Sequence, residues 1–356
     1  MEVVRVLAAV AGGCAVVWSL LEAIRAFVIP RGVQLRSRIV FYWVFRLLRA
    51  VARLRGAVER EAVDAIMVYG APIAVLGLPL LWLITTLLGF AAIFWAIDAG
   101  GFGSAIVVSG SSLFTLGFER PDGVGGAIAA FADATIGLGL LALVITYLPT
   151  LNAAFSRRES VVAMLDTRAG SPPDALTLIE RHHVFAGIET LDALWPEWER
   201  WIVDVGETHY THPMLVFFRS SEPWHSWVTA IATLLEAANF RLSAVQASGA
   251  GNAAAWMFYR AGLGAIGRLR AFFTYRVADR ETEPVDRDEF ERVLLHFDEI
   301  GVPVVEDHDL AWERFCRRRA DYEPIVDALA RLVEAPAGLW PTHEHEHFDK
   351  VASPKA

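Results

Sequence analysis

Three long apolar stretches, all within residues 1–150, limit what this chain can fold into. They run over residues 3–29, 66–97 and 124–148, and each is longer than the roughly 20 apolar residues that a helix needs to cross a bilayer. The first stretch lacks a basic n-region and a small-x-small cleavage site, so a retained helix is favoured over a cleaved signal peptide. The sequence therefore predicts an integral membrane protein with three spanning helices.

Charge divides the chain at the same place. Residues 1–150 carry 11 arginines, no lysine and 9 acidic residues, whereas residues 151–356 have a net charge of −11. The mean hydropathy of +0.39 comes from the first region, because the second has the composition of an ordinary soluble domain. Nucleic-acid binding is not expected of such an acidic region. A disulfide is not expected either, because Cys14 lies in an apolar stretch and Cys316 lies beside an arginine.

The distribution of arginines predicts the orientation. The segment 31–60 contains eight arginines and one acidic residue, whereas the segment 98–123 contains three acidic residues and one arginine. Short basic loops remain in the cytoplasm. We therefore expect the N-terminus and residues 98–123 to lie outside the plasma (inner) membrane, and residues 31–62 and 151–356 to lie in the cytoplasm.

Residues 38–55 have the pattern of an amphipathic helix. Its arginines fall on one helical stripe, and apolar residues cover much of the remaining surface. We expect this helix to lie at the inner leaflet of the lipid bilayer, with its arginines at anionic headgroups. A voltage-sensing helix is disfavoured, because only one span precedes it and no acidic partner helix is visible. The stripe consists of Arg38, Arg46, Arg49 and Arg53.

The segment between the second and third apolar stretches has the pattern of a pore loop. Residues 104–114 contain no charge and no proline, and as a helix they would extend about 16 Å, half of a bilayer. Residues 115–118 follow, and charged and turn residues come directly after them. A short helix that enters from outside aims its negative end at the membrane centre, and carbonyls turned to one axis replace a cation's hydration water. The plainer alternative is a glycine-rich outside loop.

Residues 115–118, with the sequence Thr-Leu-Gly-Phe, resemble the Thr-Val-Gly-Tyr filter of potassium channels. The order of outer helix, pore helix, filter and inner helix over residues 66–150, about a quarter of the chain, resembles the two-span pore domain of bacterial potassium channels. The resemblance implies a homotetramer that conducts K+, with Gly137 or Gly139 as the gating hinge. The implied ion-coordinating residues are Thr115, Leu116, Gly117 and Phe118.

Glu119 departs from the pattern of that family, which usually has a second glycine after the aromatic residue. The implied selectivity is therefore for potassium or, less strictly, for monovalent cations. Four copies of Glu119 would form a ring of carboxylates at the outer mouth of the pore, and such a ring attracts cations.

Asp133 lies near the middle of the third apolar stretch, where it is the only ionisable side chain between residues 124 and 147. A carboxylate facing lipid is costly, so we expect it to face protein or water. Three arrangements satisfy this expectation: bonds with pore-helix serines that support the filter, exposure to a water-filled cavity, or contact with a threonine of the second stretch. The serines are Ser109, Ser111 and Ser112, and the threonines are Thr85 and Thr86.

Residues 151–356 are predicted to form a helical domain of two or more bundled layers. Gly249 and Gly251 follow a helical pattern rather than a strand, so a nucleotide-binding regulatory domain and a cofactor are not expected. An alternative function is a membrane-anchored enzyme or metal sensor, and a third is a non-conducting scaffold. The histidine-rich tail 343–347 is a further candidate for metal binding, although a loose tail is favoured. The candidate pocket of the enzyme or sensor consists of Glu207, His209, His212 and His225.

Together these features predict a mostly α protein that acts as a cation channel rather than an enzyme. Its expected parts are a transmembrane helix over 1–30, a cytoplasmic basic loop with an interfacial helix over 31–62, a pore domain over 63–150 and a helical cytoplasmic domain over 151–356. Within the pore domain we expect an outer helix at 66–97, a pore helix at 104–114, the filter at 115–118 and an inner helix at 124–148.

Overall fold

The computed structural model describes most of the chain as helices in two compact units. The described residues are 2–27, 37–55, 60–97, 100–220, 222, 225–246, 249–273 and 285–335. Among them the only extended pairing is one antiparallel bridge between Val245 and Val304. The first unit comprises Met1–Ala154 and Thr211–Phe218, and the second comprises Phe155–Tyr210 and Arg219–Ala356. The predicted predominance of helix is confirmed.

Three of the described helices are long and apolar enough to cross a membrane, as predicted. Ser19 of the first of them donates a hydrogen bond to the Trp82 carbonyl of the second, at 3.2 Å. Seven residues earlier, Gly12 meets Gly89, where a Cβ on Gly12 would overlap the Gly89 carbonyl. These two contacts make the first two spans antiparallel neighbours. The three helices are α1 (Glu2–Phe27), α4 (Gly70–Ile97) and the first part of α6 (Gly123–Ala169).

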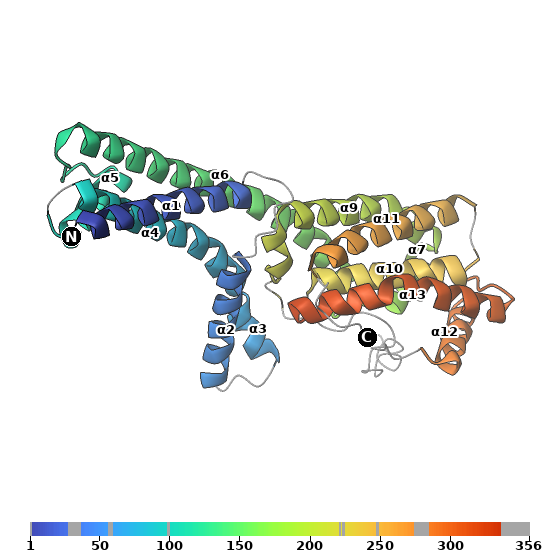
Figure 1. Ribbon diagram of the computed structural model, residues 1–356. Helices are drawn as coiled ribbons and strands as arrows, with labels where there is room; N and C mark the ends of the chain where they lie inside the picture. Colours follow the sequence, from blue (N-terminus) through green and yellow to red (C-terminus); the bar gives the residue numbers. More distant parts are fainter. Residues whose placement is uncertain are drawn as a thin grey trace. The chain divides into compact units, whose positions relative to one another are not determined.

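The span in α6 runs in the same direction as α1. Phe27, at the end of α1, packs against Tyr147 of α6 with ring centroids 4.2 Å apart. At the other end of α1, the Arg5 guanidinium lies over the ring of Trp95, near the end of α4. The start of α1, the end of α4 and the start of α6 therefore gather at one end of the first unit, together with the short helix α5 (Phe102–Leu113), as Figure 1 shows.

Two further helices lie at the opposite end of the first unit, namely α2 (Ser37–Leu54) and α3 (Arg60–Met67). In Figure 1, α2 runs across the direction of α1 and α4. Phe45 and Leu48 of α2 pack against Gly70 at the start of α4, where a Cβ would lie 2.8 Å from the Phe45 ring. The amphipathic pattern that predicted a helix at 38–55 thus corresponds to a helix at 37–54.

A short segment that is distant in sequence also belongs to the first unit. The 3-10 helix η1 (Pro213–Phe217) packs on α4. Phe217 lies beside Phe45 of α2, with ring centroids 6.0 Å apart, and His212 lies 5.3 Å from Tyr147 of α6. Residues 211–218 therefore join the end of the first unit that carries α2.

Two helix boundaries within residues 63–150, the predicted pore domain, differ from the prediction. The outer helix begins at Gly70 instead of residue 66, because a turn at residues 68–69 separates it from α3. Pro149 does not end the inner helix, since α6 continues to Ala169. Proline at this position removes a single backbone hydrogen bond, and the helix continues past it. The short helix predicted at 104–114 spans Phe102–Leu113.

The second unit is a bundle with α10 at its centre. Nearly every residue of α10 is buried, and the helix contacts α7, α11 and α13. Phe240 of α10 packs against Phe315 of α13 and Phe290 of α12, with ring centroids 4.6 and 5.9 Å away. After α6, the helices are α7 (Ala175–Ala186), α8 (Glu189–Asp192), α9 (Trp195–Thr211), α10 (Trp227–Ser243), α11 (Gly249–Phe273), α12 (Arg287–Glu299) and α13 (His308–Val333).

Candidate functional site

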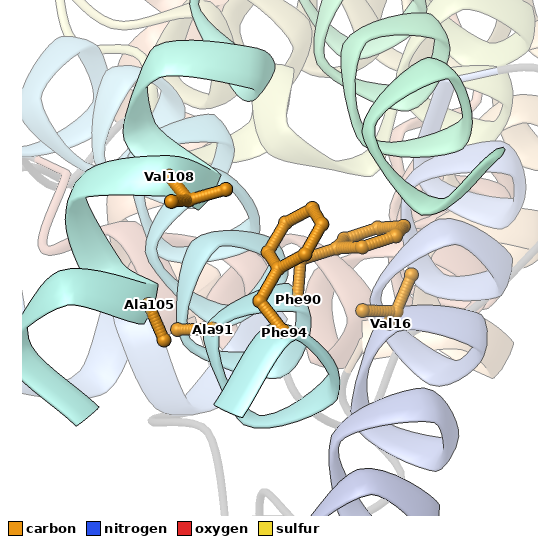
Figure 2. Packing of buried hydrophobic residues seen from close by; sticks show 6 residues of the cluster. All are labelled: Val16, Phe90, Ala91, Phe94, Ala105 and Val108. Carbon is orange, nitrogen blue, oxygen red and sulfur yellow. The ribbon is translucent and has the colours of Figure 1, made fainter. Parts of the chain in front are cut away.

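Helix α5 is packed into the first unit alongside α4. Ala105 and Val108 join a buried apolar cluster whose other members come from α1 and α4 (Figure 2). Further along α5, the Ser109 hydroxyl lies 3.0 Å from the Leu87 carbonyl oxygen of α4. Leu87 is ten residues before the end of α4, about 15 Å along the helix axis. The second half of α5 therefore lies well inside the length of the span. The other members of the cluster are Val16, Phe90, Ala91 and Phe94.

Helix α6 packs against α5 through Gly137 and Asp133. A Cβ on Gly137 would overlap the carbonyl oxygen of Leu113, so only glycine permits this close approach at the end of α5. One turn earlier, Asp133 is fully buried, and its Oδ2 lies 2.9 Å from the Ser109 hydroxyl oxygen. Its Oδ1 has no hydrogen-bond partner among the described residues. The second predicted hinge residue, Gly139, lies on a side of α6 with no neighbour within 4 Å of an added Cβ.

The partner of Asp133 is thus one of the three serines proposed for it. The other two serines face elsewhere: Ser111 and Ser112 are buried, and their described contacts are with the residues that follow α5. Thr85 donates its hydroxyl to the Leu81 carbonyl of its own helix at 2.8 Å. Thr86 is buried, and its hydroxyl has no hydrogen-bond partner among the described residues. The structure therefore brings Asp133 to α5 rather than to either threonine.

A hydrogen-bonded turn ends α5 and fixes the backbone that follows. The Thr115 N–H donates to the Ser112 carbonyl at 2.9 Å, and the Leu116 N–H donates to the Ser111 carbonyl at 2.8 Å. This pair of bonds is a Schellman motif, which needs a left-handed residue after the helix cap. Thr115 occupies that position with a φ of 54°, where glycine is the usual residue. The Gly117 N–H also donates to the Ser111 carbonyl, at 3.2 Å, and Gly117 has a φ of 72°.

The donors of this turn determine where its carbonyl oxygens point. In a planar trans peptide, the N–H and the C=O point in opposite directions. The N–H groups of residues 115, 116, 117 and 119 all donate to Ser111 or Ser112. The carbonyl oxygens of residues 114, 115, 116 and 118 therefore point away from α5. One of them, that of residue 114, also accepts the Thr115 hydroxyl. Residues 114–119 are exposed, so these oxygens lie on an open side of the first unit.

The hydroxyl of Ser111 reaches the far end of the same loop. The Glu119 N–H donates to the Ser111 hydroxyl oxygen at 3.0 Å, and the hydroxyl donates to the Glu119 carbonyl, also at 3.0 Å. The sequence offers Ser111 as one of three possible serine partners of Asp133 and does not predict this contact with Glu119. No local pattern pairs a helical serine with a backbone group eight residues further on.

Each residue of the alternative metal or substrate pocket has a separate described partner. His212 belongs to the first unit, whereas the other three belong to the second. Across the part of the chain that the structure describes, no group of three or more His, Cys, Asp or Glu side chains is arranged to hold a metal. The tail 343–347 lies outside the described residues. The partners are Arg268 for Glu207, Arg158 for His209, Tyr147 for His212 and Asp166 for His225.

The second unit buries a different polar group between α10 and α13. Glu236 is fully buried; its Oε1 accepts a bond from Arg319 at 2.5 Å, and its Oε2 accepts the Tyr322 hydroxyl. Burial raises the pKa of Glu236 to about 7, and Arg319 and Tyr322 oppose that rise. Asn239 donates to the Tyr322 hydroxyl at 3.1 Å. Sequence reasoning missed this group, because Glu236 and Arg319 are 83 residues apart.

No protein-family model, curated protein or solved structure matches this chain. The class of the protein is therefore defined by its own fold. It is a predominantly helical membrane protein with three candidate spanning helices, in which a short apolar helix ends in an exposed loop.

Proposed function

We propose that this chain is one subunit of a cation channel, in which residues 115–118 of four chains surround a common axis. The observation that carries the proposal is the direction of the carbonyl oxygens of residues 114, 115, 116 and 118, which point away from α5 on an open side of the unit. Carbonyl oxygens turned to an axis replace the hydration shell of a potassium ion or another monovalent cation. One chain supplies one such strand, so a ring needs several copies, and the resemblance to potassium channels sets the number at four.

The depth of the loop supports the proposal. The second half of α5 lies about 15 Å inside the span, near the middle of a hydrocarbon core about 30 Å thick. Non-helical backbone at that depth is tolerated only where protein covers it or where it lines water. Residues 114–119 are exposed in the single chain, so a lone subunit would turn polar backbone toward lipid. A ring of subunits around an aqueous axis removes that cost.

Asp133 and α6 fit the same arrangement. Asp133 is buried on the side of α6 that faces α5, where it bonds to Ser109, and this supports the interpretation that its carboxylate backs the loop instead of facing a central cavity. The opposite side of α6, which includes Gly139 and Thr135, is exposed in the single chain. In the ring this exposed side of α6 lines the axis below the loop, and Gly139 has the free space that a gating hinge needs.

In this proposal the loop lies at the outer side and α2 at the inner leaflet. Helix α5, which leads into the loop, packs on the second half of α4, whereas α2 packs on its first residue, Gly70. The arginine-rich segment marks the cytoplasmic end. The second unit then lies in the cytoplasm, where the predicted architecture has residues 151–356. Exposed arginines beside exposed apolar side chains suit α2 to a surface of anionic lipids. The arginines are Arg46, Arg49 and Arg53, and the apolar side chains are Trp43, Leu47 and Leu54.

Ion flux from purified protein in liposomes tests the proposal. We expect a potassium gradient to drive flux in liposomes that contain the protein and not in protein-free liposomes. We also expect light scattering in detergent to give the mass of four 39.2 kDa chains. A well-folded protein that carries neither potassium nor sodium would contradict the proposal.

A further inference from the structure

We propose that Ser111 is the residue that positions the carbonyl oxygens of the loop, because it holds both ends of the loop at once. The proposal rests on the channel function above. The Ser111 carbonyl accepts the N–H groups of Leu116 and Gly117, at 2.8 and 3.2 Å. Its hydroxyl accepts the N–H of Glu119 and donates to the Glu119 carbonyl, at 3.0 Å each.

The chemistry of a serine hydroxyl allows both bonds to Glu119 at the same time. A hydroxyl has one donor and two acceptor sites, so it can accept an N–H and donate to a carbonyl of the same residue. Ser111 is fully buried and Glu119 is exposed, so these bonds tie the exposed end of the loop to the buried end of α5. The backbone between residues 116 and 119 is thus closed by contacts with a single residue of α5.

Each of these bonds sets the direction of one carbonyl oxygen, because the N–H and the C=O of a peptide are opposed. The bond of the Leu116 N–H fixes the direction of the Thr115 carbonyl, and the bond of the Gly117 N–H fixes the direction of the Leu116 carbonyl. The bond of the Glu119 N–H fixes the direction of the Phe118 carbonyl. The first two depend on the Ser111 backbone, which any residue supplies. The Phe118 carbonyl, at the outer end of the loop, depends on the Ser111 hydroxyl.

Removal of the Ser111 hydroxyl should therefore allow the Phe118 carbonyl to change direction, while the rest of the loop keeps its bonds to the Ser111 backbone. In Ser111→Ala, the Phe118–Glu119 peptide loses its bond to α5 and can rotate, whereas the Thr115 and Leu116 carbonyls keep their directions. Ser111→Thr retains a hydroxyl. Ser112 is the matched control: it is the next residue, it is also buried, and its described bond with the loop comes from its carbonyl.

The test compares the K+/Na+ permeability ratio of the four full-length proteins in liposomes, with light scattering as the check on assembly. We expect Ser111→Ala to conduct with a ratio about fivefold lower, the factor that corresponds to one hydrogen bond of about 1 kcal/mol. Ser111→Thr and Ser112→Ala should keep the parent ratio. A parent-like ratio in Ser111→Ala, or an equal loss in Ser112→Ala, would overturn the proposal. If Ser111→Ala does not assemble, Ser111→Cys, a weak hydrogen-bonding group of similar size, takes its place with the same criterion.

Amide hydrogen exchange separates this proposal from the channel function. The Glu119 amide should exchange faster in Ser111→Ala than in Ser112→Ala, whether or not the protein conducts. Equal exchange in the two variants would show that the hydroxyl does not hold the loop. Absence of flux in the parent protein, with the exchange difference intact, would overturn the channel and leave the positioning role of Ser111 standing.

Discussion

Ser111 of the first unit and Glu236 of the second are both fully buried, but they bond to different kinds of partner. In the first unit, the Ser111 hydroxyl bonds to backbone groups, the N–H and the carbonyl of Glu119. In the second unit, the carboxylate of Glu236 bonds to other side chains, those of Arg319 and Tyr322. The Ser111 bonds fix the local path of the chain after α5, whereas the Glu236 bonds connect α10 to α13.

This difference indicates what each buried group is for. A side chain that satisfies the backbone of a non-helical segment permits that segment to lie where a helix would otherwise be required. A buried ion pair between helices contributes less to net stability than its contacts suggest, but breaking it leaves an unpaired buried charge. Substitutions around α5 should therefore change conduction, and substitutions between α10 and α13 should change folding.

The largest expected effect is the loss of conduction in Gly117→Ala. An alanine Cβ meets nothing within 4 Å there, so packing is not disturbed, but the φ of 72° is costly for any residue with a side chain. The loop should change shape and conduction should cease while the protein remains assembled. Flux in liposomes measures this, with Gly103→Ala on α5 as the control, because Gly103 also has open space around it and lacks a positive φ. Normal flux in Gly117→Ala would show that the loop is not a filter.

In the second unit, Glu236→Ala should lower the free energy of unfolding by about 3–5 kcal/mol, the usual cost of leaving one member of a buried pair unpaired. Denaturant unfolding of the full chain measures this effect. The control is Glu313→Ala, which breaks an exposed pair with Arg317 and should cost about 0.5 kcal/mol or less. Equal costs in the two variants would mean that the Glu236 pair is not isolated from water.

The same carboxyl predicts a pH dependence. The pKa of Glu236 in the folded protein is about 7, above its ordinary value of 4.5, so the folded state binds this proton more readily than the unfolded state. Its contribution to stability is therefore fully present below pH 4.5 and is lost as the pH rises toward 7. Glu236→Gln, which cannot ionise, should flatten the stability curve in that range. A curve as steep as that of the parent protein would place the titrating group elsewhere.

The spans and the amphipathic helix could be predicted from sequence because each depends on a local pattern. An apolar run of about 20 residues is typical of a helix that spans a bilayer. The arginine stripe of α2 repeats at helical spacing. The local rule for Pro149 failed, because a single missing backbone hydrogen bond does not outweigh the continuation of α6 to Ala169.

The details of the candidate site could not be predicted, because its bonds join groups that no local pattern pairs. The sequence indicated that Asp133 needs a polar partner and supplied three serines, but only the packing of α6 on α5 selects Ser109. The need for glycine at position 137 could not be predicted either, because it arises from the close approach of the Leu113 carbonyl of another helix. The role of residues 115–118 in conduction stays a prediction.

A smaller effect is expected at Asp133, where the backbone of the loop is supported indirectly. Asp133→Asn should assemble and conduct with an altered K+/Na+ permeability ratio or open-state lifetime, because the contact with Ser109 is weakened rather than removed. Asp133→Leu removes it. Single-channel recordings in bilayers at low and high salt distinguish the alternatives: rescue by salt would point to a carboxylate that faces the ion path. Parent-like selectivity and conductance in Asp133→Leu would leave the residue with no role in conduction.

The smallest effect is expected at Glu119, whose backbone is held by Ser111 while its side chain is exposed. A carboxylate about 10 Å from an ion in water attracts it by about 0.4 kcal/mol, which doubles the local cation concentration. Salt screens this attraction, since the Debye length falls from about 30 Å at 0.01 M to about 3 Å at 1 M. Glu119→Gln should therefore reduce conductance at low salt and leave it nearly unchanged at high salt. Asp122→Asn, three residues further from the loop, should have a weaker effect of the same sign. Identical conductance of Glu119→Gln and the parent protein at low salt would show that the carboxylates do not surround the mouth of the pore.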